Sequence, residues 1–507
     1  MSITRRRFLA RTSTAALAAT TLWPALRSRA FAAPAGGETR DGDLAELRKR
    51  FGARLVAPSD KDYDKLRRVR NRAFDDVMPR AIAMAASEDD VAAAVAWAAA
   101  NKVPIVPRNG GHSYIGQSTC DGLVVSLVNM AGARVDKAAL TAEIDAGALL
   151  GDVNVALLKQ DVALPTGSCP SVGVAGLTLG GGIGFSSRHW GLMADNLVGA
   201  RVVLASGEVV DCSETEKKDL LWLCRGGGGG QFGVVTKLRF RVHPVEPISE
   251  FRLSWPWRSA ERALDAWQRF APDAPDRLFS VCTLSKGKGT PNIAAYGRYF
   301  GSPKELREVL APLVAAAKPT SAPKITASTL WASHVVGPGC WPDPAQCHSW
   351  NHPQPGRFQQ QSYKVKSDFY RENLPSDGVA TLIREMAGIQ EQAISWGAII
   401  LDSLGGAINR VAKDATAYVH RDHRFQAEYV IHWGAKTAPA KVEANLAWLR
   451  GLYAAMRPWA SGECYQNYPD TDRSDWRQAY YGQNLAHLEA CKKALDPDRV
   501  FHGPQVL

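Results

Sequence analysis

Hydrophobic and polar positions follow two patterns along this chain, and each pattern predicts a different kind of structure. Between residues 60 and 246, short apolar runs are separated by glycine-rich and polar segments, which predicts strands alternating with helices. The strands are expected at 103–106, 123–127 and about 141–146. Helices are expected near 151–159 and over 89–101, the latter capped by Ser87 with Val91 and Val95 on one face. The apolar run 197–204 and the turn at 205–207 predict a hairpin.

From about 247 to 460 the pattern changes to longer alternating strands separated by amphipathic helices. The strands are expected over 251–255, 279–284, 293–300, 393–401 and 418–433. The helices are expected over 303–317 and 438–457; the second ends at Pro458 and places on one face Val442, Leu446, Leu449 and Tyr453. This half therefore predicts an antiparallel sheet backed by helices, and the chain as a whole an α+β fold.

The first residues have the pattern of a bacterial export signal. The twin-arginine stretch 4–9 (Thr-Arg-Arg-Arg-Phe-Leu) precedes an apolar segment over 15–22 and a small-residue cleavage site at 30–32. The apolar segment is shorter than the ~20 residues that cross a bilayer as a helix, and no later segment is long and uncharged enough to do so. We therefore expect a signal peptide over 1–32, the twin-arginine machinery as a partner, a periplasmic or secreted protein, and no stable membrane insertion.

Length and charge limit the class of protein further. Removing residues 1–32 takes away six arginines and no acidic residue, so the net charge falls from +11 to +5. That modest charge, without basic arms or basic patches interleaved with aromatic residues, disfavours nucleic acid as a partner. About 475 mature residues exceed one ordinary core, so two domains are expected.

The nine cysteines do not form a dense disulfide framework, but two of them are close in sequence. Cys340 and Cys347 lie in a loop rich in glycine, proline and tryptophan, and they are the best candidates for a disulfide. The competing interpretation, a zinc site with His348 and His352, has the wrong ligand spacing for the common structural zinc patterns. We therefore predict no metal-binding residues.

Two glycine-rich stretches, 106–114 and 167–173, are the main candidates for a binding site. The first lies between two predicted strands, so it forms a tight loop. Paired glycines let the backbone approach a ligand, and successive free N–H groups form a concavity suited to an anion such as pyrophosphate. A glycine run by itself could also be an ordinary set of turns. No glycine run, including 226–230, has the Gly-x-Gly-x-x-Gly pattern of a strand-to-helix nucleotide fold, which disfavours a nicotinamide-binding Rossmann domain.

The two stretches, Gly110-Gly111-His112-Ser113 and Gly167-Ser168-Cys169-Pro170-Ser171-Val172-Gly173, resemble the berberine-bridge-enzyme-like oxidases of the vanillyl-alcohol-oxidase flavoprotein group. The resemblance implies a PCMH-type FAD-binding domain of two α/β subdomains over 60–246. It also implies an α+β substrate domain over 247–460 and a C-terminal segment, 461–507, that returns to the FAD domain. It further implies FAD bonded through both His112 and Cys169.

Further cofactor-binding residues follow from the same resemblance. They are expected to be Arg108, Asn109, Gly110, Gly111, Ser113, Val172, Gly173, Gly176, Gly180, Asn196, Val235 and Asn467. Asn109 departs from the family pattern, which usually has glycine there, while the rest of the loop is intact.

The catalytic residues are also implied by the resemblance. The segment 464–470 is similar to the family's Tyr-x-Asn-Tyr element, which makes Tyr468 the catalytic base and Tyr114 a second tyrosine near the flavin. An ordinary phenol has a pKa of about 10, so Tyr468 would need a nearby cation or hydrogen bonds to its phenolate. Asp402, at the end of a predicted strand, either tunes Tyr468 or is an exposed turn residue. Without the motif, each tyrosine would be read as an ordinary half-buried core residue.

The expected activity is that of an exported FAD-dependent oxidase. Tyr468 would take a proton from the hydroxyl of a small-molecule substrate while hydride passes from the adjacent carbon to the flavin, and dioxygen would then be reduced to hydrogen peroxide. Sugars oxidised at C1 and secondary alcohols of natural products are the two substrate classes that the resemblance implies. The alternatives are a flavin-binding redox or sensor protein without useful turnover, and a dehydrogenase with another electron acceptor.

Overall fold

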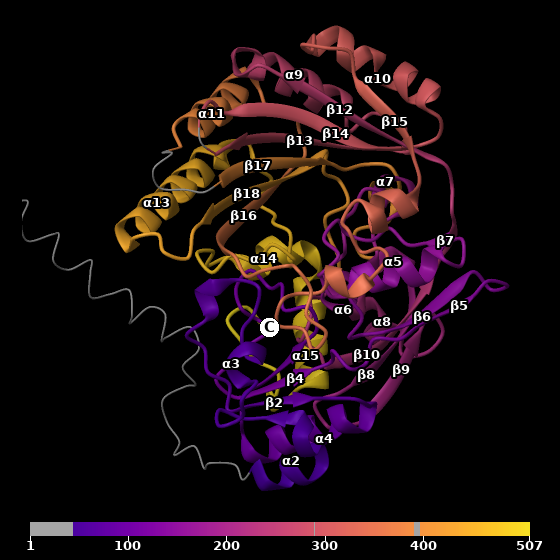
Figure 1. The fold of residues 1–507 in the computed structure, drawn as a ribbon, viewed down its shortest axis with the longest axis vertical. Coiled ribbons are helices and arrows are strands. Elements are labelled where there is room, and N and C mark those ends of the chain that lie inside the picture. Colours follow the sequence, from indigo (N-terminus) through magenta and orange to yellow (C-terminus); the bar gives the residue numbers. More distant parts are fainter. Residues whose placement is uncertain (1–43, 288, 390–395) are drawn as a thin grey trace, which may run out of the picture. The chain divides into compact units, whose positions relative to one another are not determined.

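The computed structural model describes residues 44–287, 289–389 and 396–507. The predicted signal peptide lies outside these residues. Helices and strands occupy separate layers, which confirms the expected α+β class (Figure 1). None of the helices in the described ranges is both long and apolar enough to cross a membrane.

A four-stranded sheet, in the order β1-β2-β4-β3, begins the described chain. Its strands are β1 (Leu55–Val56), β2 (Ala81–Met84), β3 (Ile105–Arg108) and β4 (Leu123–Ser126). Strands β2, β3 and β4 are parallel, because α4 (Glu88–Asn101) returns the chain between β2 and β3. The Ser87 side chain accepts the Asp90 N–H (3.2 Å), which confirms the predicted helix and its cap. Helices α2 (Leu44–Phe51) and α3 (Tyr63–Leu66) precede β2.

A five-stranded antiparallel sheet, in the order β5-β6-β10-β8-β9, follows. Its strands are β5 (Ala133–Asp136), β6 (Thr141–Asp145), β8 (Leu197–Val203), β9 (Val209–Ser213) and β10 (Val234–Arg241). The predicted hairpin is formed by β8 and β9. The helices of this region are α5 (Leu150–Leu158), α6 (Val174–Leu179), α7 (Ser187–Trp190) and α8 (Lys218–Cys224), and β7 (Val162–Ala163) pairs with β11 (His243–Pro244). The glycine content of 173–184 concealed α6, which starts directly after Gly173.

The second half is built on a seven-stranded sheet in the order β15-β12-β14-β13-β17-β18-β16, antiparallel throughout as expected. The strands are β12 (Ile248–Trp255), β13 (Leu278–Lys286), β14 (Asn292–Phe300), β15 (Lys324–Ser328), β16 (Ser362–Tyr370), β17 (Trp396–Ser403) and β18 (Phe425–Trp433). The helices are α9 (Ala260–Phe270), α10 (Pro303–Ala317), α11 (Ser376–Ala387), α12 (Ala407–Arg410) and α13 (Pro439–Met456). Residues 393–395 of one predicted strand lie outside the described residues.

Two features of this sheet differ from the prediction. The strand expected over 418–433 begins only at Phe425, because residues 418–424 bond to other parts of the chain. The Tyr418 N–H donates to the Arg225 carbonyl (3.1 Å), and the Arg421 guanidinium donates to Asp195 (2.6 Å). The edge strand β16 was not predicted, since its lysines interrupt the apolar pattern.

The two faces of the sheet carry different side chains. On β18, Phe425 and Tyr429 belong to the apolar cluster that also includes residues of α9, α10, α11 and α13, which cover this face (Figure 1). Glu428, Val430 and His432 alternate with them and line a cavity on the opposite face. The period of two along each strand therefore separates a core face from a cavity face.

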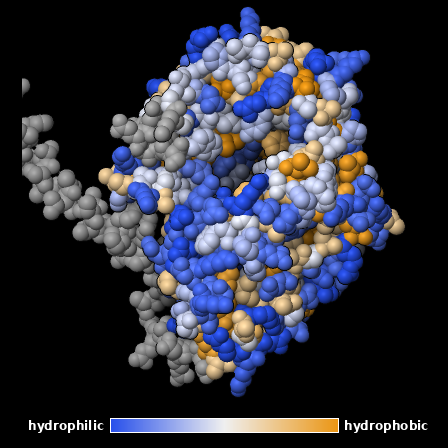
Figure 2. Space-filling view, in the orientation of Figure 1, coloured by the Kyte–Doolittle hydropathy of each residue, from blue (hydrophilic) through white to orange (hydrophobic). Residues whose placement is uncertain are grey.

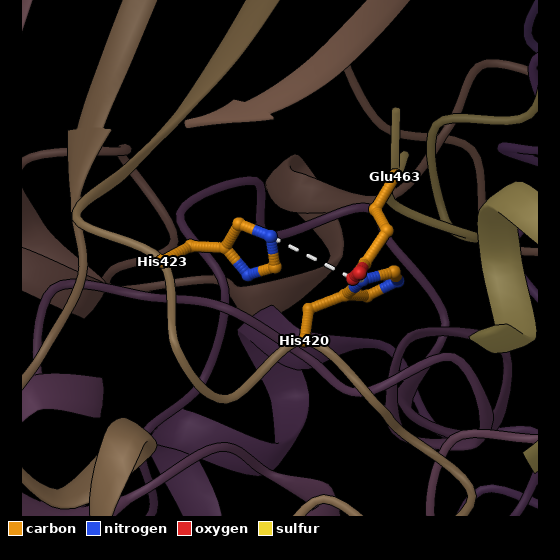
Figure 3. Close-up of side chains that lie close together, drawn as sticks. All are labelled: His420, His423 and Glu463. Atoms are coloured by element: carbon orange, nitrogen blue, oxygen red, sulfur yellow. Dashed lines mark hydrogen bonds and ion pairs between the residues drawn. The ribbon is translucent and has the colours of Figure 1, made fainter. Parts of the chain in front are cut away.

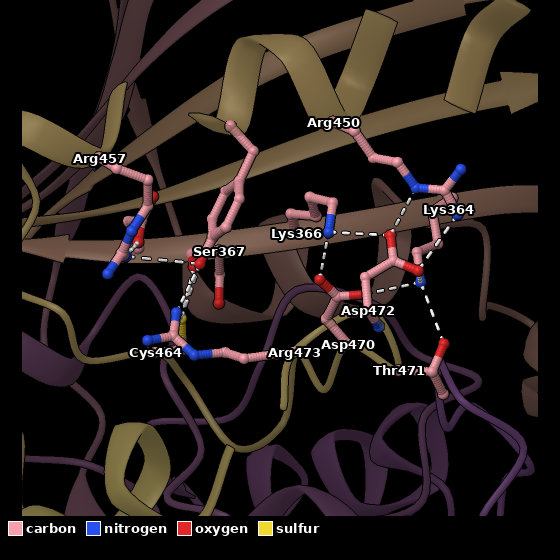
Figure 4. A network of polar contacts seen from close by, with 12 residues as sticks. Lys364, Lys366, Ser367, Arg450, Arg457, Cys464, Asp470, Thr471, Asp472 and Arg473 are labelled. Atoms are coloured by element: carbon pink, nitrogen blue, oxygen red, sulfur yellow. Dashed lines mark hydrogen bonds and ion pairs between the residues drawn. The ribbon is translucent and has the colours of Figure 1, made fainter. Parts of the chain in front are cut away.

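The C-terminal segment is fixed to β16 by ion pairs (Figure 4). Lys364 contacts Asp470 (2.6 Å), Lys366 contacts Asp472 (3.0 Å), and Arg450 of α13 contacts Asp472 (2.9 Å). The segment continues as α14 (Trp476–Tyr481) and α15 (Leu485–Leu495). Tyr480, Tyr481 and Leu488 belong to the core of the glycine-rich half, so the C-terminal segment packs against that half.

Cys340 and Cys347 form the predicted disulfide. Their sulfurs are bonded to each other, so they are not zinc ligands. His348 Nε2 instead pairs with Asp152 of α5 (3.0 Å), which places the disulfide-closed loop against this helix.

Candidate active site

A cavity of about 480 Å³ lies between the glycine-rich loops and the open face of the seven-stranded sheet. This volume is typical of a ligand site. Its walls come from 107–118, 167–183, 228–235, β16, β17, β18 and 465–469. Figure 2 shows the surface hollowed below the strands of the sheet. Segments far apart in the sequence thus enclose one space.

The glycines bring two loops into direct backbone contact at the cavity. A Cβ at Gly110 would lie 2.5 Å from the Gly173 nitrogen, and a Cβ at Gly173 would lie 2.3 Å from Cγ of Asn109. Gly111 has φ +69°, a conformation that other residues rarely adopt. Any side chain at 110 or 173 would force the loops apart. The asparagine at 109 is fixed in place here, because its Nδ2 donates to the carbonyls of Ala146 and Ala148.

His112 and Cys169 meet at a single hydroxyl group, that of Ser171. His112 Nε2 hydrogen-bonds Ser171 Oγ (3.0 Å), and Cys169 Sγ lies 3.5 Å from the same oxygen. Burial, with the Arg70 guanidinium adding to it, lowers the pKa of His112 to about 3. The imidazole is therefore neutral at physiological pH and keeps the lone pair that a nucleophile needs.

The lining of the cavity fits FAD. Apart from its own helix, no described residue lies within 4 Å of a Cβ placed on Gly176, so this position faces open space in the cavity that the His112 and Cys169 loops also line. Asn109 Oδ1 is buried and makes no hydrogen bond within the described part of the chain, so an acceptor remains for a bound group. The glycine loops can hold the dinucleotide, while His112 and Cys169 offer two nucleophiles at one place for its ring.

Two tyrosines stack where the C-terminal segment meets the sheet. The rings of Tyr114 and Tyr468 have centroids 5.2 Å apart and planes 19° apart. Tyr114 donates its hydroxyl to Glu428 Oε1 of β18 (3.0 Å). Gln426, directly opposite Asp402 in the β17–β18 register, lies beside the Tyr468 hydroxyl. Its amide is buried and faces the Tyr468 hydroxyl, without a hydrogen bond of ordinary geometry to any described residue.

The electrostatics around Tyr468 differ from the expectation. Burial raises the pKa of Tyr468 well above 10, and the carboxylates Glu428 and Asp402 raise it further, while Gln426 acts in the opposite direction. Burial raises the pKa of Asp402 to about 7. Burial also raises the pKa of Glu428 to about 7, against the hydrogen bond from Tyr114. At neutral pH Tyr468 is therefore a phenol beside two carboxyl groups that titrate.

Most of the residues predicted for the site line this cavity. They are Asn109, Gly110, Gly111, His112, Ser113, Tyr114, Cys169, Val172, Gly173, Gly176, Val235, Asn467 and Tyr468.

Four predicted residues lie elsewhere. Asn196 uses its side-chain amide on the carbonyls of Trp190 and Leu192 and on His243, so this amide is not available to a cofactor. Arg108 donates to the carbonyls of Ser118, Leu66 and Arg67 and holds the loop from behind. The backbone of Gly180 contacts Asn467 rather than the cavity. Asp402 lies on the same face of β17 as Ile400 but is not among the residues that line the cavity, and its charge raises the pKa of Tyr468.

The sequence did not single out several residues of the sheet wall. These are Arg70, Tyr363, Trp396, Glu428 and His432. His432 lies between two other rings, with centroids 5.4 Å from Trp396 and 5.4 Å from Tyr363. Apolar and polar residues alternate along β18, and this pattern could have placed Glu428 and His432 on one face of the strand. It does not indicate which face of the sheet lines a cavity.

Comparison with known proteins defines the class of this site. A family model described as "FAD binding domain" matches residues 79–213, and one described as "Berberine and berberine like" matches residues 464–506. These two segments contribute the His112 loop, the Cys169 loop and the Tyr468 segment. The protein is therefore an FAD-linked oxidoreductase.

Relatives over nearly the whole chain identify the family. The chain is 33% identical to the FAD-linked oxidoreductase YgaK of Bacillus subtilis (strain 168), over 89% of this chain and 96% of that protein. It is 33% identical to chitooligosaccharide oxidase of Gibberella zeae, over 84% of this chain and 87% of that protein. Physcomitrella patens BBE-like 1 shares the fold with a TM-score of 0.80 and 29% identity, over 91% and 98% of the two chains. The chain belongs to the berberine-bridge-enzyme-like family of FAD-linked oxidoreductases.

Proposed function

We propose that this protein oxidises a hydroxylated small molecule with FAD bonded to both His112 and Cys169, and that it reduces dioxygen to hydrogen peroxide. The observation that carries the proposal is the shared contact of His112 and Cys169 with Ser171 Oγ at the cavity wall. Two nucleophiles held at one hydroxyl can reach neighbouring positions on one ring.

The cofactor, when bound, supplies the hydride acceptor and passes the electrons to dioxygen. The chain supplies binding, orientation and proton transfer. The loops around Gly110 and Gly173 hold the dinucleotide, and the sheet wall faces it across the cavity. The buried Gln426 amide orients the substrate hydroxyl toward Tyr468.

Proton removal involves Tyr468 together with the two carboxyl groups. At neutral pH the Tyr468 phenol already carries its proton, so it can accept the proton of the alcohol only if it passes its own proton to another base in the same step. Asp402 and Glu428, each with a pKa of about 7, exchange protons at neutral pH and are suited to take it up. The hydrogen bond from Tyr114 to Glu428 positions this carboxyl beside the tyrosine stack.

A sugar oxidised at C1 is the favoured substrate class. Trp396, His432 and Tyr363 form an aromatic wall, and Trp396 keeps 36% of its surface exposed at the cavity. Exposed aromatic faces of this kind stack on the apolar face of a sugar ring. The relationship to a protein named chitooligosaccharide oxidase supports this class. Secondary alcohols of natural products are the rival, and a panel of sugars and alcohols tested by anaerobic flavin bleaching separates the two.

The linkages can be tested directly. Denatured wild-type protein should keep its flavin colour, and one tryptic flavopeptide should contain both His112 and Cys169. His112→Ala and Cys169→Ala should each retain one linkage, and the double variant should release free FAD in acid. Colour that separates from the denatured wild-type protein would reduce the site to noncovalent binding.

Two alternatives remain to be separated from the oxidase. Steady peroxide production with any hydroxylated substrate excludes a redox or sensor protein without turnover. Turnover that needs an artificial acceptor, with little peroxide in air, would instead identify a dehydrogenase.

We also propose export through the twin-arginine pathway. The pattern at 4–9 and the cleavage site at 30–32 support it, and FAD can be inserted before a folded protein is exported. Replacing Arg5, Arg6 and Arg7 by lysine should retain the flavoprotein in the cytoplasm of a bacterial host, as fractionation and amino-terminal sequencing would show. Unchanged export of this variant would contradict the proposal.

A further inference from the structure

A group of metal-ligand side chains lies outside the flavin cavity. His420 and His423 belong to the segment between α12 and β18, and Glu463 directly precedes the segment that carries Tyr465, Asn467 and Tyr468. One ligand atom from each of the three residues lies within 4.8 Å of the others (Figure 3). No metal-binding residues were predicted from the sequence; His420 and His423 are three positions apart, but Glu463 follows only forty positions later.

The distances suit a common central ion. His420 Nδ1 is 2.7 Å from Glu463 Oε2, and His423 Nε2 is 3.6 Å from the same oxygen. Ligands about 2.0–2.1 Å from a tetrahedral Zn²⁺ lie about 3.3 Å apart, so the two contacts to Glu463 Oε2 are already close to that spacing, and the two histidine atoms, within 4.8 Å of each other, would move together around the ion. Two imidazoles and one carboxylate are a donor set that suits zinc and its first-row neighbours.

The histidines are buried with unused nitrogens. Neither imidazole has exposed surface. Among the described residues, no hydrogen bond is made by His420 Nε2 or by either ring nitrogen of His423. Buried polar atoms without partners are rare and costly. The hydrogen bond between His420 and Glu463 leaves His423 Nε2 with only a longer contact to Glu463 Oε2 (3.6 Å), whereas an ion would bind this nitrogen directly.

Polar side chains surround the three proposed ligands on the sides that face away from the ion. Asp422 Oδ1 is 3.4 Å from His423 Nδ1, on the side of the ring opposite Glu463. Gln466 lies beside His420, and its Oε1 likewise makes no hydrogen bond to the described residues. Arg371 holds Glu463 Oε1, which leaves Oε2 toward the histidines. A carboxylate therefore lies near the second nitrogen of His423, and an amide lies beside His420, the kinds of group that set the tautomer and ring orientation of histidines in metal sites.

We propose that His420, His423 and Glu463 bind a structural divalent transition-metal ion, with Zn²⁺ the best fit. The ion ties 418–424 to the segment that enters the flavin cavity. Phe369 supports this junction, because its ring stacks on His420 with centroids 4.3 Å apart and its N–H donates to the Glu463 carbonyl (3.1 Å). Glu463 is the ligand with exposed surface, 18% of its side chain, so solvent completes the coordination from that side.

The test uses the full-length flavoprotein produced in zinc-supplemented medium, because the buried histidines can be loaded during folding. Elemental analysis should find one zinc per chain in the wild type. His423→Phe, which fills the space beside Phe369 without a ligand atom, should lower the zinc content at least tenfold. His487→Ala, which removes an exposed histidine outside the cluster, should retain it.

Two measurements on the wild type do not depend on variants folding. Protein produced with Co²⁺ in place of zinc should show visible absorption bands of a nitrogen- and oxygen-bound ion at longer wavelength than the flavin. The zinc-loaded protein should melt about 3–5 °C above protein produced without zinc. Zinc content no higher in the wild type than in His423→Phe would overturn the site, and equal melting temperatures with and without zinc would overturn its structural role.

Discussion

Ser171 shows how one small side chain can organise a reactive site. It is fully buried, and its hydroxyl contacts both His112 Nε2 and Cys169 Sγ. The loop backbone beside it is closed by the Val172 N–H, which donates to the Cys169 carbonyl (3.2 Å). The histidine and the cysteine come from loops more than fifty residues apart, and this hydroxyl lies within bonding distance of both.

The first prediction concerns Tyr468. Tyr468→Phe keeps the ring that stacks on Tyr114 and removes the group that exchanges a proton. We expect normal flavin content and anaerobic flavin reduction slower by roughly 10²–10⁴-fold, the contribution of a positioned base. Stopped-flow measurement of flavin bleaching gives the rate. Tyr63→Phe, at a buried tyrosine bonded to the Pro79 carbonyl, is the control and should be unchanged. Equal rates in the two variants would remove Tyr468 from the mechanism.

The second prediction concerns Val172, which lines the cavity three residues after Cys169. A valine leaves room beside the flavin for a diatomic molecule, and one more methylene fills that room in a packed wall. Val172→Leu should be reduced by substrate at the normal rate and be reoxidised by air at least tenfold more slowly. Val172→Ala should be reoxidised as fast as the wild type. If Val172→Leu and wild type share one reoxidation rate, oxygen reaches the flavin by another route.

At the scale of elements, the β17–β18 pair places two acidic side chains on the face of the sheet that is turned toward the cavity. Asp402 faces Gln426 and Ile400 faces Glu428 across the register, so both carboxyl groups lie on the cavity face. The same strands bury Leu401 and Tyr429 against the helices. The strands thus hold both carboxyl groups in fixed positions, and burial raises the pKa of each to about 7.

The third prediction follows from this pair. Because burial raises the pKa of Asp402 and of Glu428 to about 7, both are neutral acids well below pH 7 and carboxylates above it. Only the carboxylate can accept a proton, so the rate of flavin reduction should rise with pH and level off above about 7. Below that value it should fall by about tenfold per pH unit. The two groups interact, so the inflection belongs to the pair.

Single substitutions identify the group that matters. Glu428→Gln and Asp402→Asn keep the shape of each side chain and remove its titration. The plot of flavin-reduction rate against pH should lose its inflection near pH 7 in only one of the two variants. The carboxyl group replaced in that variant is the proton acceptor. A reduction rate that does not change between about pH 5 and 8 in the wild type would exclude both carboxyls as proton acceptors.

At the scale of the whole molecule, one buried arginine connects the glycine-rich half to the sheet half. Arg188 of α7 donates to the carbonyls of Leu278 (2.8 Å), Pro272 (2.9 Å), Ala274 (2.5 Å) and Leu404. It has 1% of its surface exposed. The cavity lies between the halves that this side chain joins, so its geometry depends on that junction.

The fourth prediction tests this connection. Arg188→Met keeps the volume and removes every donor, which leaves buried carbonyls without partners. We expect a loss of about 2–4 kcal/mol in the free energy of unfolding and a slower flavin reduction from a misaligned cavity. Thermal unfolding of the flavoprotein measures the first. Arg258→Met, at an exposed arginine, should change neither. Unaltered stability of Arg188→Met would show that the halves are held together by other contacts.

Much of the architecture could be predicted from the chain alone. The Ser87 cap, the hairpin of β8 and β9, and the period of two on β13 and β14 depend on local backbone preferences and burial, which the residue order records. The disulfide joins cysteines only seven positions apart. The glycine loops were predictable for the same reason, because close backbone approach at Gly110 and Gly173 excludes any side chain.

Tertiary structure decided which polar groups face each other. Asn196 has the residue type of a cofactor ligand, yet three partners in the fold use its amide. Glu428 looks like an ordinary strand carboxyl until the register places it under Tyr114. His420 and Glu463 are forty-three positions apart and come into contact only through the fold. A sequence pattern specifies whether a side chain is buried, but the three-dimensional packing specifies its neighbours, and those neighbours set its pKa and its chemistry.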